Sequence, residues 1–270
     1  MIFVITSTKG GVGKSNSAVL LACLLEVKQK NFKIVEIDNN NQSLLFKNSE
    51  FLNEEIMISV KLDKKTEVLA DVMFNTMNDP SLDYIIDLGG GDDTKILESI
   101  ISLPLDKKYI IPITADKKYL KNAVDTFEMI NDPENTFFIL NRYSTLQNLR
   151  QDFIYFFGDE KMGIQPVSPI FTNSKYVAIP NSQFFQIAAD EEQTILDLAK
   201  ISMENDEREI HNIFFQQANG DRQKYHQLFM MYEKSKEAAK VFAEIIENTK
   251  PLNLGNCTET ELKCTENEQS

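Results

Sequence analysis

The heptapeptide KGGVGKS, residues Lys9–Ser15, decides how this chain of 270 residues is interpreted. It lies between an apolar, β-branched run, Ile2–Thr6, and a helical pattern over Ser15–Lys30. Glycines lack a Cβ, so the backbone N–H groups of such a loop can turn inward around an anion, and the helix N-terminus that follows adds donors and a positive dipole end. A flexible turn with a chance Lys-Ser pair is the alternative, which the flanking strand and helix disfavour. The heptapeptide therefore predicts a binding site for nucleotide phosphates.

Each residue of the loop has an expected role in holding a nucleoside triphosphate. The Lys14 ammonium is expected to reach the β- and γ-phosphates and to act in phosphoryl transfer, and the Ser15 hydroxyl is expected to ligate Mg²⁺. The predicted nucleotide-binding residues of this segment are Gly10, Gly11, Val12, Gly13, Lys14, Ser15 and Asn16.

Beyond the loop, short β-rich runs alternate with helical patterns through the first 170 residues. This alternation implies an α/β fold, with a mostly parallel sheet and helices on both faces, in which ligands bind beyond the carboxyl ends of the strands. The predicted strands are Ile2–Thr6, Lys33–Asp38, Ile56–Leu62, Tyr84–Leu88, Tyr109–Ile113, Thr136–Asn141 and, last, Val167–Phe171. The predicted helices between them are Ser15–Lys30, Glu67–Met77, Thr94–Leu103, Tyr119–Ile130 and Leu146–Phe157.

From about Gln183 the pattern becomes all-helical. Helices are predicted over Ile187–Met203, Glu209–Gln217 and Gln223–Asn248, and the last carries an apolar stripe that we expect to pack onto the sheet domain, with a partner or dimer helix as the alternative. We therefore divide the chain into a nucleotide-binding domain (1–185), a helical C-terminal extension (186–250) and an acidic, disordered tail (251–270).

Composition narrows the class of protein further. Hydrophobic residues make up 42% of the chain and include 18 Phe, enough for a substantial core. No apolar run is long enough to span a bilayer and no secretory leader is recognisable, so we expect a cytoplasmic protein that does not bind membranes. The net charge of -13 argues against coating nucleic acid by bulk charge, although much of the excess acid lies in residues 186–206 and 251–270.

A lysine cluster flanks one predicted strand, with aspartates interleaved. We interpret it as solvated surface, with a DNA-facing patch as the alternative. The cluster consists of Lys107, Lys108, Lys117, Lys118 and Lys121.

Two carboxylates lie at the carboxyl ends of predicted strands, at the same edge of the sheet as the loop. Asp38 ends the second strand, where a carboxylate beside the γ-phosphate can position water; a cap on the next turn is the alternative. Asp87 ends the apolar run Asp83–Leu88 and precedes three glycines, Gly89–Gly91. Such an acid is expected to hold Mg²⁺, and the glycines to let the backbone approach the γ-phosphate and switch with it. The predicted metal-binding residues are Ser15, Asp38 and Asp87.

The loop departs from the ordinary spacing G-x-x-x-x-G-K-S, because Thr8 stands where that pattern has glycine and Lys9 precedes the glycine pair. In this it resembles the deviant Walker A loop, K-G-G-x-G-K-[ST], of the ParA/MinD superfamily of P-loop NTPases. The resemblance covers about residues 1–200. It implies that Lys9 crosses a dimer interface to the partner's nucleotide, and that Asp38 orients the attacking water, although Glu36 replaces the first acid of the family's D-x-D element.

The same resemblance indicates which residues contact the adenine base of the nucleotide. Asn141, at the end of a predicted strand, matches the family's residue that reads the adenine edge through its amide, and Arg142 follows it as in many relatives. An Asx turn after a strand is the alternative interpretation.

Together these features imply a slow, partner-stimulated ATPase that uses ATP and Mg²⁺ and forms a homodimer on ATP binding. We expect it to act in plasmid DNA partition or in positioning a cargo complex, with a protein partner and with DNA contacted directly or through an adaptor. Close behind stands a TraL-like ATPase of conjugative DNA transfer. A metabolic P-loop ligase and a nucleotide-binding scaffold without hydrolysis are the alternatives from other classes.

Overall fold

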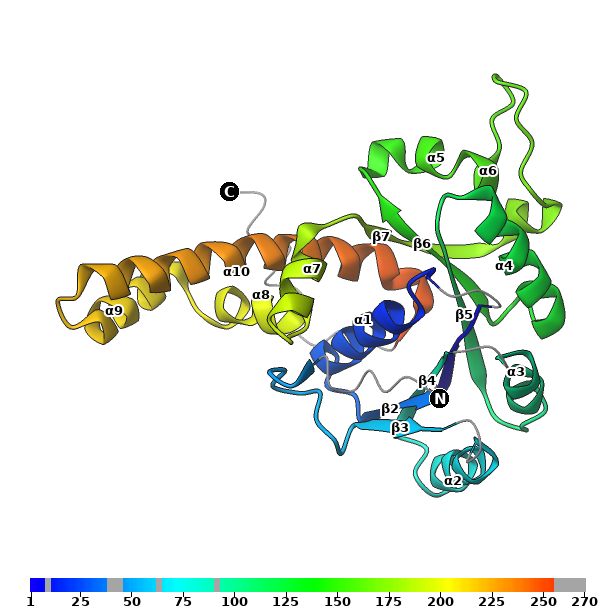
Figure 1. The fold of residues 1–270 in the computed structure, drawn as a ribbon, viewed down its shortest axis with the longest axis horizontal. Coiled ribbons are helices and arrows are strands. Elements are labelled where there is room, and N and C mark those ends of the chain that lie inside the picture. Colours follow the sequence, from blue (N-terminus) through cyan, green and yellow to red (C-terminus); the bar gives the residue numbers. More distant parts are fainter. Residues whose placement is uncertain (8–10, 38–45, 62–64, 90–92, 255–270) are drawn as a thin grey trace.

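The computed structural model describes residues 1–7, 11–37, 46–61, 65–89 and 93–254. Seven strands form one sheet in the order β3-β2-β4-β1-β5-β6-β7, and every neighbouring pair runs parallel (Figure 1). The predicted α/β class is therefore confirmed. The strands are β1 (Ile2–Ile5), β2 (Phe32–Ile37), β3 (Met57–Val60), β4 (Asp83–Leu88), β5 (Lys107–Ile113), β6 (Thr136–Tyr143) and β7 (Lys175–Pro180).

Helices cover both faces of the sheet, as parallel crossovers require. On one face α1 packs with the C-terminal helices, and on the other α2, α3 and α4 pack with α6 (Figure 1). The helices are α1 (Lys14–Val27), α2 (Lys65–Asn78), α3 (Asp93–Ile101), α4 (Lys117–Ile130), α5 (Leu149–Asp152), α6 (Ile154–Phe157), α7 (Gln183–Asp190), α8 (Ile195–Glu204), α9 (Glu207–Ala218) and α10 (Arg222–Thr249).

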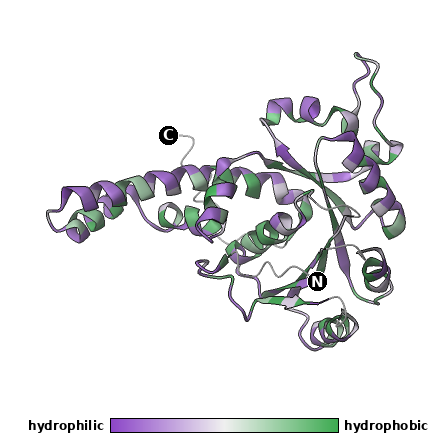
Figure 2. Ribbon diagram, viewed as in Figure 1, coloured by the Kyte–Doolittle hydropathy of each residue, from purple (hydrophilic) through white to green (hydrophobic). Residues whose placement is uncertain are grey.

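Alternation along the strands builds two cores. In β1, Phe3 and Ile5 face the α1 side, whereas Ile2 and Val4 face the α2–α4 side. Figure 2 shows apolar stretches in the central strands, whose two faces are both buried, and in α1.

Three predicted elements differ from the structure. The predicted strand Val167–Phe171 is wrong: Pro169 begins a 3₁₀ helix, Pro169–Asn173, capped by Ser168, and the seventh strand follows at Lys175–Pro180. Phe171 is instead buried against Phe138 and Phe156.

The other two differences are breaks in predicted helices. The pattern over Leu146–Phe157 forms a 3₁₀ turn and two short helices, with Phe153 fully buried at the break. The predicted helix Ile187–Met203 is divided, because Glu192 adopts a left-handed conformation (φ 56°) and Thr194 starts a new helix with a capping box.

The C-terminal helices have an inner and an outer part. Ala238, Phe242 and Ile245 of α10 lie in the same core cluster as the strands, which agrees with the expected packing of this helix on the sheet. Toward its start α10 leaves the sheet and pairs with α9, forming an arm that projects from the molecule (Figure 1). A small cluster around Phe214 and Tyr232 holds this arm together.

The lysine cluster does not form one patch. Lys107 and Lys108 lie at the start of β5, where their ammonium groups donate to the backbone carbonyls of Leu103 and Leu252, respectively. Lys117, Lys118 and Lys121 lie beyond its other end, in α4. Within the described residues, no helix combines the length and apolarity needed to cross a membrane.

Candidate nucleotide-binding site

The turn from β1 into α1 requires glycine at two of its described positions. Gly11 and Gly13 have φ values of 82° and 93°, a region that residues with a Cβ enter at a cost. Gly13 is the N-cap of α1, so the loop ends on the amino end of a 14-residue helix. Lys14 follows at once, and its Nζ donates to the Ser7 carbonyl oxygen at 3.2 Å, across the turn. Two glycines of the predicted loop thus adopt the conformation that glycine favours, and the loop ends on a helix N-terminus, which has donors for an anion.

The end of β6 lies directly against this loop. Asn141 Nδ2 donates to the Val12 carbonyl oxygen at 2.9 Å. A Cβ added to Gly13 would stand 3.0 Å from the same Nδ2 atom. The absence of a side chain at Gly13 is thus what allows the strand-end amide to approach the loop.

A cavity of about 590 Å³ opens beside this contact. It is large enough for a nucleotide-sized ligand, and it lies beyond the carboxyl ends of β5, β6 and β7, where parallel α/β sheets bind ligands. Six predicted nucleotide-binding residues line it together: Gly11, Val12, Gly13, Asn16, Asn141 and Arg142.

Arg142 lies in a bulge at the mouth of the cavity. Its φ of 68° is left-handed, and the register between β6 and β7 shifts between Asn141 and Tyr143. Such a backbone costs on the order of 1 kcal/mol for a residue other than glycine, and strained positions of this kind cluster at functional sites. The bulge sends Arg142 to the surface while Tyr143 is buried.

Tyr143 fastens this strand end to α10. Its hydroxyl donates to the Glu244 carboxylate and accepts a hydrogen bond of 2.8 Å from Asn248 Nδ2. Burial raises the pKa of the Tyr143 phenol, and the Glu244 carboxylate raises it further. The strand end that carries Asn141 and Arg142 is therefore braced by the C-terminal helix.

Of the two predicted acids, Asp87 lies on the other side of the loop, whereas Asp38 falls outside the described residues. Asp87 in β4 is the register partner of Ile5 in β1 and of Glu36 in β2, so the two carboxylates are neighbours on one row of the sheet. Both are buried, and Glu36 accepts a hydrogen bond of 2.8 Å from the Ser59 hydroxyl on the next strand. Glu36 is thus held by β3, whereas Asp87 stands one strand from the residues that lead into the loop.

The inner wall of the cavity is formed by α1, α7 and α8. Cys23 of α1 is completely buried there, and this burial raises the pKa of its thiol to about 12 against a smaller opposing effect of the Thr194 hydrogen bond. A thiol in this state is protonated at neutral pH and serves as packing, not as a nucleophile.

The predicted site residues thus fall into three groups. Six line the cavity, as described above. Lys14, Ser15 and Asp87 lie outside its lining, at the start of α1 and the end of β4. Lys9, Gly10 and Asp38 lie outside the described residues.

Sequence reasoning identified six of the residues that line the cavity and missed the rest of its wall. The β7 end was not identified because the last strand was expected earlier in the chain. The polar residues Asn181 and Ser182 directly follow a β-rich run. The rule that ligands bind beyond the carboxyl ends of parallel strands would therefore have indicated them as site residues. The polar wall residues that were not predicted are Ser17, Thr114, Asn181, Ser182, Gln183, Gln186, Gln193 and Thr194.

A comparison with known protein families identifies the family of this chain. The family model described as the CobQ/CobB/MinD/ParA nucleotide binding domain matches residues 3–183. Since this is more than half of the chain, the protein belongs to that family, and with it to the ParA/MinD-type nucleotide-binding ATPases. No curated protein sequence matches the chain.

The chain is also similar to solved structures, among them the following three with a bound nucleotide. The McdA–ATP complex of Cyanothece is 14% identical and covers 88% of this chain and 96% of its own, with a TM-score of 0.45. A structure described as a plasmid partition protein from Borrelia burgdorferi B31, bound to AMPPNP, is 17% identical over 86% and 97%, with a TM-score of 0.43. MinD of Pyrococcus horikoshii OT3 with Mg-ADP is 14% identical over 89% and 95%, with a TM-score of 0.45.

The described residues fit the nucleotide and the metal ion that this family implies. Two left-handed glycines shape the loop, an ammonium group follows it, and the Ser15 hydroxyl and the Asp87 carboxylate are oxygen donors of the kind Mg²⁺ prefers. Among the described residues, no cluster of three or more His, Cys, Asp or Glu side chains forms a separate metal site.

Proposed function

We propose that the protein is an ATP-dependent dimerising switch ATPase of the ParA/MinD type, which hydrolyses ATP slowly and under the control of a protein partner. The observation that carries this proposal is the glycine loop between β1 and α1, contacted by the Asn141 amide at the edge of a nucleotide-sized cavity. Membership of the family supports the choice of ATP.

In this proposal different residues bind different parts of the nucleotide. Backbone N–H groups of the loop and the start of α1 hold the phosphates, with Lys14 as the cation at the β- and γ-phosphates. The second N–H and the oxygen of the Asn141 amide bind the adenine edge, and Arg142 lies beside it. Ser15, Asp38 and Asp87 would hold Mg²⁺, which would neutralise part of the phosphate charge.

Two residues outside the described ranges complete the cycle. Lys9 contacts the partner subunit's nucleotide and so makes dimerisation depend on ATP, and Asp38 orients the attacking water. Positioning of this kind supplies most of the catalysis in phosphoryl transfer. The cell would use the resulting timing to partition plasmid DNA or to position a cargo complex.

Sedimentation with ATP, ADP or no nucleotide, read beside ATP turnover, tests the switch. We expect ATP alone to shift the protein from monomer to dimer, and Lys9→Ala to bind ATP without dimerising. Asp38→Ala should dimerise but lose turnover by at least tenfold. A monomer that persists at saturating ATP excludes the switch, and unchanged turnover in Asp38→Ala excludes the assigned water-orienting residue.

The role in DNA partition needs its own measurement. DNA binding is expected only with ATP, and it should weaken as the salt concentration rises, because Lys and Arg contacts to phosphate release counterions. Binding that appears only when a partner protein is added would assign DNA contact to an adaptor. DNA association absent under both conditions would exclude the partition role while leaving the ATPase intact.

A further inference from the structure

Helix α2 has an apolar stripe that faces away from the sheet. Leu69 and Val72 of this helix are buried in the core beneath it. Phe74 and Met77 are instead 66% and 68% exposed, and Ala70 is exposed as well. Because residues at positions i, i+4 and i+7 lie on one side of a helix, these last three side chains form a continuous surface. We call this surface, made of Ala70, Phe74 and Met77, the α2 stripe.

The two large side chains of the α2 stripe are neighbours. Phe74 and Met77 are three positions apart, on successive turns, so a single apolar partner can cover both. Apolar residues that are exposed singly are common on protein surfaces, whereas contiguous ones mark contact sites. Removing this area from water is favourable, so the α2 stripe is suited to contact with another molecule.

Acidic residues lie along one side of the α2 stripe. Glu67 and Asp71, both exposed, are one turn apart, and Asp71 lies one turn before Phe74. Asp79 directly follows the helix, whose carbonyl end adds partial negative charge. From residue 66 to residue 94 the sequence contains seven Asp or Glu and no Lys or Arg, and Lys65 begins the helix nine positions before Phe74. The surroundings of the stripe therefore favour a cationic partner.

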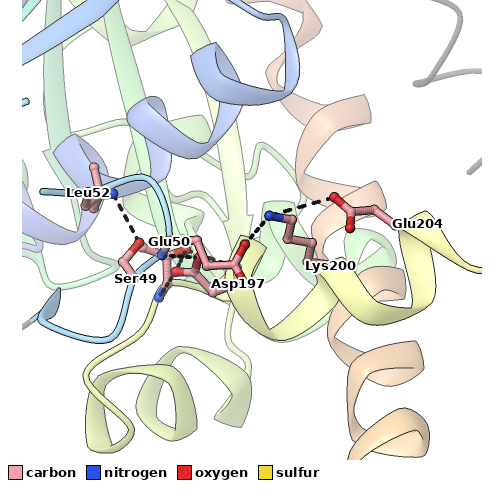
Figure 3. A network of polar contacts seen from close by, with 7 residues as sticks. Ser49, Glu50, Leu52, Asp197, Lys200 and Glu204 are labelled. Carbon is pink, nitrogen blue, oxygen red and sulfur yellow. Dashed lines mark hydrogen bonds and ion pairs between the residues drawn. The ribbon is translucent and has the colours of Figure 1, made fainter.

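The acidic segment 186–206 is used differently (Figure 3). Asp197 Oδ1 accepts the backbone N–H of Glu50 at 3.1 Å. Lys200 pairs with the carboxylate of Glu50 and lies 3.8 Å from that of Glu204. These acids hold parts of the chain to one another, whereas the acids beside the α2 stripe lie in a stretch of sequence without a base of its own.

The α2 stripe is also separate from the nucleotide site. Helix α2 connects the carboxyl end of β3 to the start of β4, so its last turns lie at the amino edge of the parallel sheet (Figure 1). At that edge the amino group of Met1 pairs with Asp83, the first residue of β4. The glycine loop and the cavity lie at the opposite, carboxyl edge. A molecule bound over Phe74 therefore leaves the nucleotide loop accessible.

We propose that the α2 stripe is a docking surface for an amphipathic helix of another protein. Apolar side chains of that helix cover Phe74 and Met77, and Lys or Arg residues beside them lie against Glu67 and Asp71. The charge argues against other occupants, because a second copy of this chain would add like charges, and anionic lipid or DNA would be repelled. Docking at this edge needs neither ATP nor the nucleotide-dependent dimer, so the inference goes beyond the proposed switch.

Two synthetic helical peptides test the α2 stripe on the full chain. Both carry Leu at positions i, i+3, i+4 and i+7, and the flanking positions are Lys in one peptide and Glu in the other. By fluorescence anisotropy we expect the Lys peptide to bind roughly tenfold more tightly than the Glu peptide, equally with and without ATP. The difference between the peptides should shrink as salt is added, because these charges are exposed.

The variants locate the binding. Phe74→Ser with Met77→Ser removes both apolar anchors and should weaken the Lys peptide by roughly tenfold. Glu67→Gln with Asp71→Asn should weaken it at low salt and have little effect at high salt. Met162→Ser is the matched control, since Met162 is 67% exposed outside α2, and it should leave the affinity unchanged. ATP turnover should equal wild type in all of these variants, because none of the substituted residues lines the cavity.

Each of the contrary outcomes overturns the proposal. Absence of binding by both peptides excludes the docking surface, and equal binding of the two excludes the selection by charge. Binding that Phe74→Ser with Met77→Ser does not weaken lies elsewhere on the protein. Nucleotide-free self-association in sedimentation that this variant abolishes would assign the stripe to a second copy, and binding to phosphatidylserine vesicles lost in the variant would assign it to membranes. If the protein hydrolyses no ATP but the stripe binds the Lys peptide as expected, the proposed function fails and this inference stands.

Discussion

The Asn141 amide and the Val12 carbonyl oxygen form a 2.9 Å hydrogen bond between two segments that are 129 residues apart in the chain. It joins the end of β6 to the loop before α1, and both residues line the cavity. The bond uses one N–H of the Asn141 amide, which has a second N–H donor and an oxygen acceptor for the proposed contact with adenine.

Replacing Asn141 by alanine should therefore affect both the apoprotein and nucleotide choice. Loss of the bond to Val12 is expected to lower the free energy of unfolding by about 1 kcal/mol. ATP affinity should fall about tenfold, with a reduced preference for ATP over GTP, measured by calorimetric titration. Asn173→Ala, at an exposed position outside the cavity, is the control. Unchanged preference in Asn141→Ala would remove this residue from base recognition.

Gly13→Ala should cost more than backbone strain alone. Gly13 and Gly163 both have positive φ, 93° and 67°, so alanine at either is expected to lower stability by about 1–2 kcal/mol. At Gly13 the new Cβ also meets Asn141 at 3.0 Å, whereas at Gly163 it meets nothing within 4 Å. ATP binding should fall at least tenfold in Gly13→Ala and stay unchanged in Gly163→Ala. Equal binding by the two variants would contradict the close approach.

Two phenylalanines of the C-terminal helices should differ strongly in how much their replacement by alanine lowers the free energy of unfolding in urea. Phe242 of α10 is fully buried among strand residues, and Phe242→Ala is expected to lower the free energy of unfolding by about 3–5 kcal/mol. Phe215 of α9 is 72% exposed, and its replacement by alanine should change stability by less than about 0.5 kcal/mol. Similar values for the two would show that the inner part of α10 does not belong to the core.

Alkaline pH should weaken the fold partly through Cys23. Burial raises the pKa of this thiol from its ordinary value near 9 to about 12, so the folded state keeps a proton that the unfolded state loses. The contribution is complete below pH 9 and declines as the pH rises toward 12, by up to about 1.4 kcal/mol per pH unit. Urea unfolding at pH 8 to 11 should show a shallower decline in Cys23→Ala than in wild type. Parallel declines would mean that the thiol ionises equally in both states.

The parts of the fold that local pattern determines could be predicted from the sequence. Glycines between a strand and a helix, and alternation of short apolar runs with helical periods, place β1, the loop and α1 correctly. The break between α7 and α8 could also be predicted from the sequence, since Thr194 and Asp197 form the T-x-x-D pattern of a capping box.

The remaining differences depend on contacts between distant residues. The run around Phe171 looks like a strand until its aromatic partners Phe138 and Phe156 are known. That error hid the true β7 end and with it Asn181 and Ser182. The pairing of Glu50 with Lys200 joins residues 150 positions apart, and no local pattern indicates it.

The contact between Lys108 and the carbonyl oxygens of Leu252 and Asn253 brings the last described residues back to the first strand. Lys108 is the register partner of Phe3, and Met1 pairs with Asp83 at the same end of the sheet. The two ends of the described chain, Met1 and the segment that finishes at Leu254, therefore lie at the same end of the sheet. A circular permutant that joins these two ends by a short linker, and is opened at the exposed turn near Met162, should keep the same arrangement of elements in space.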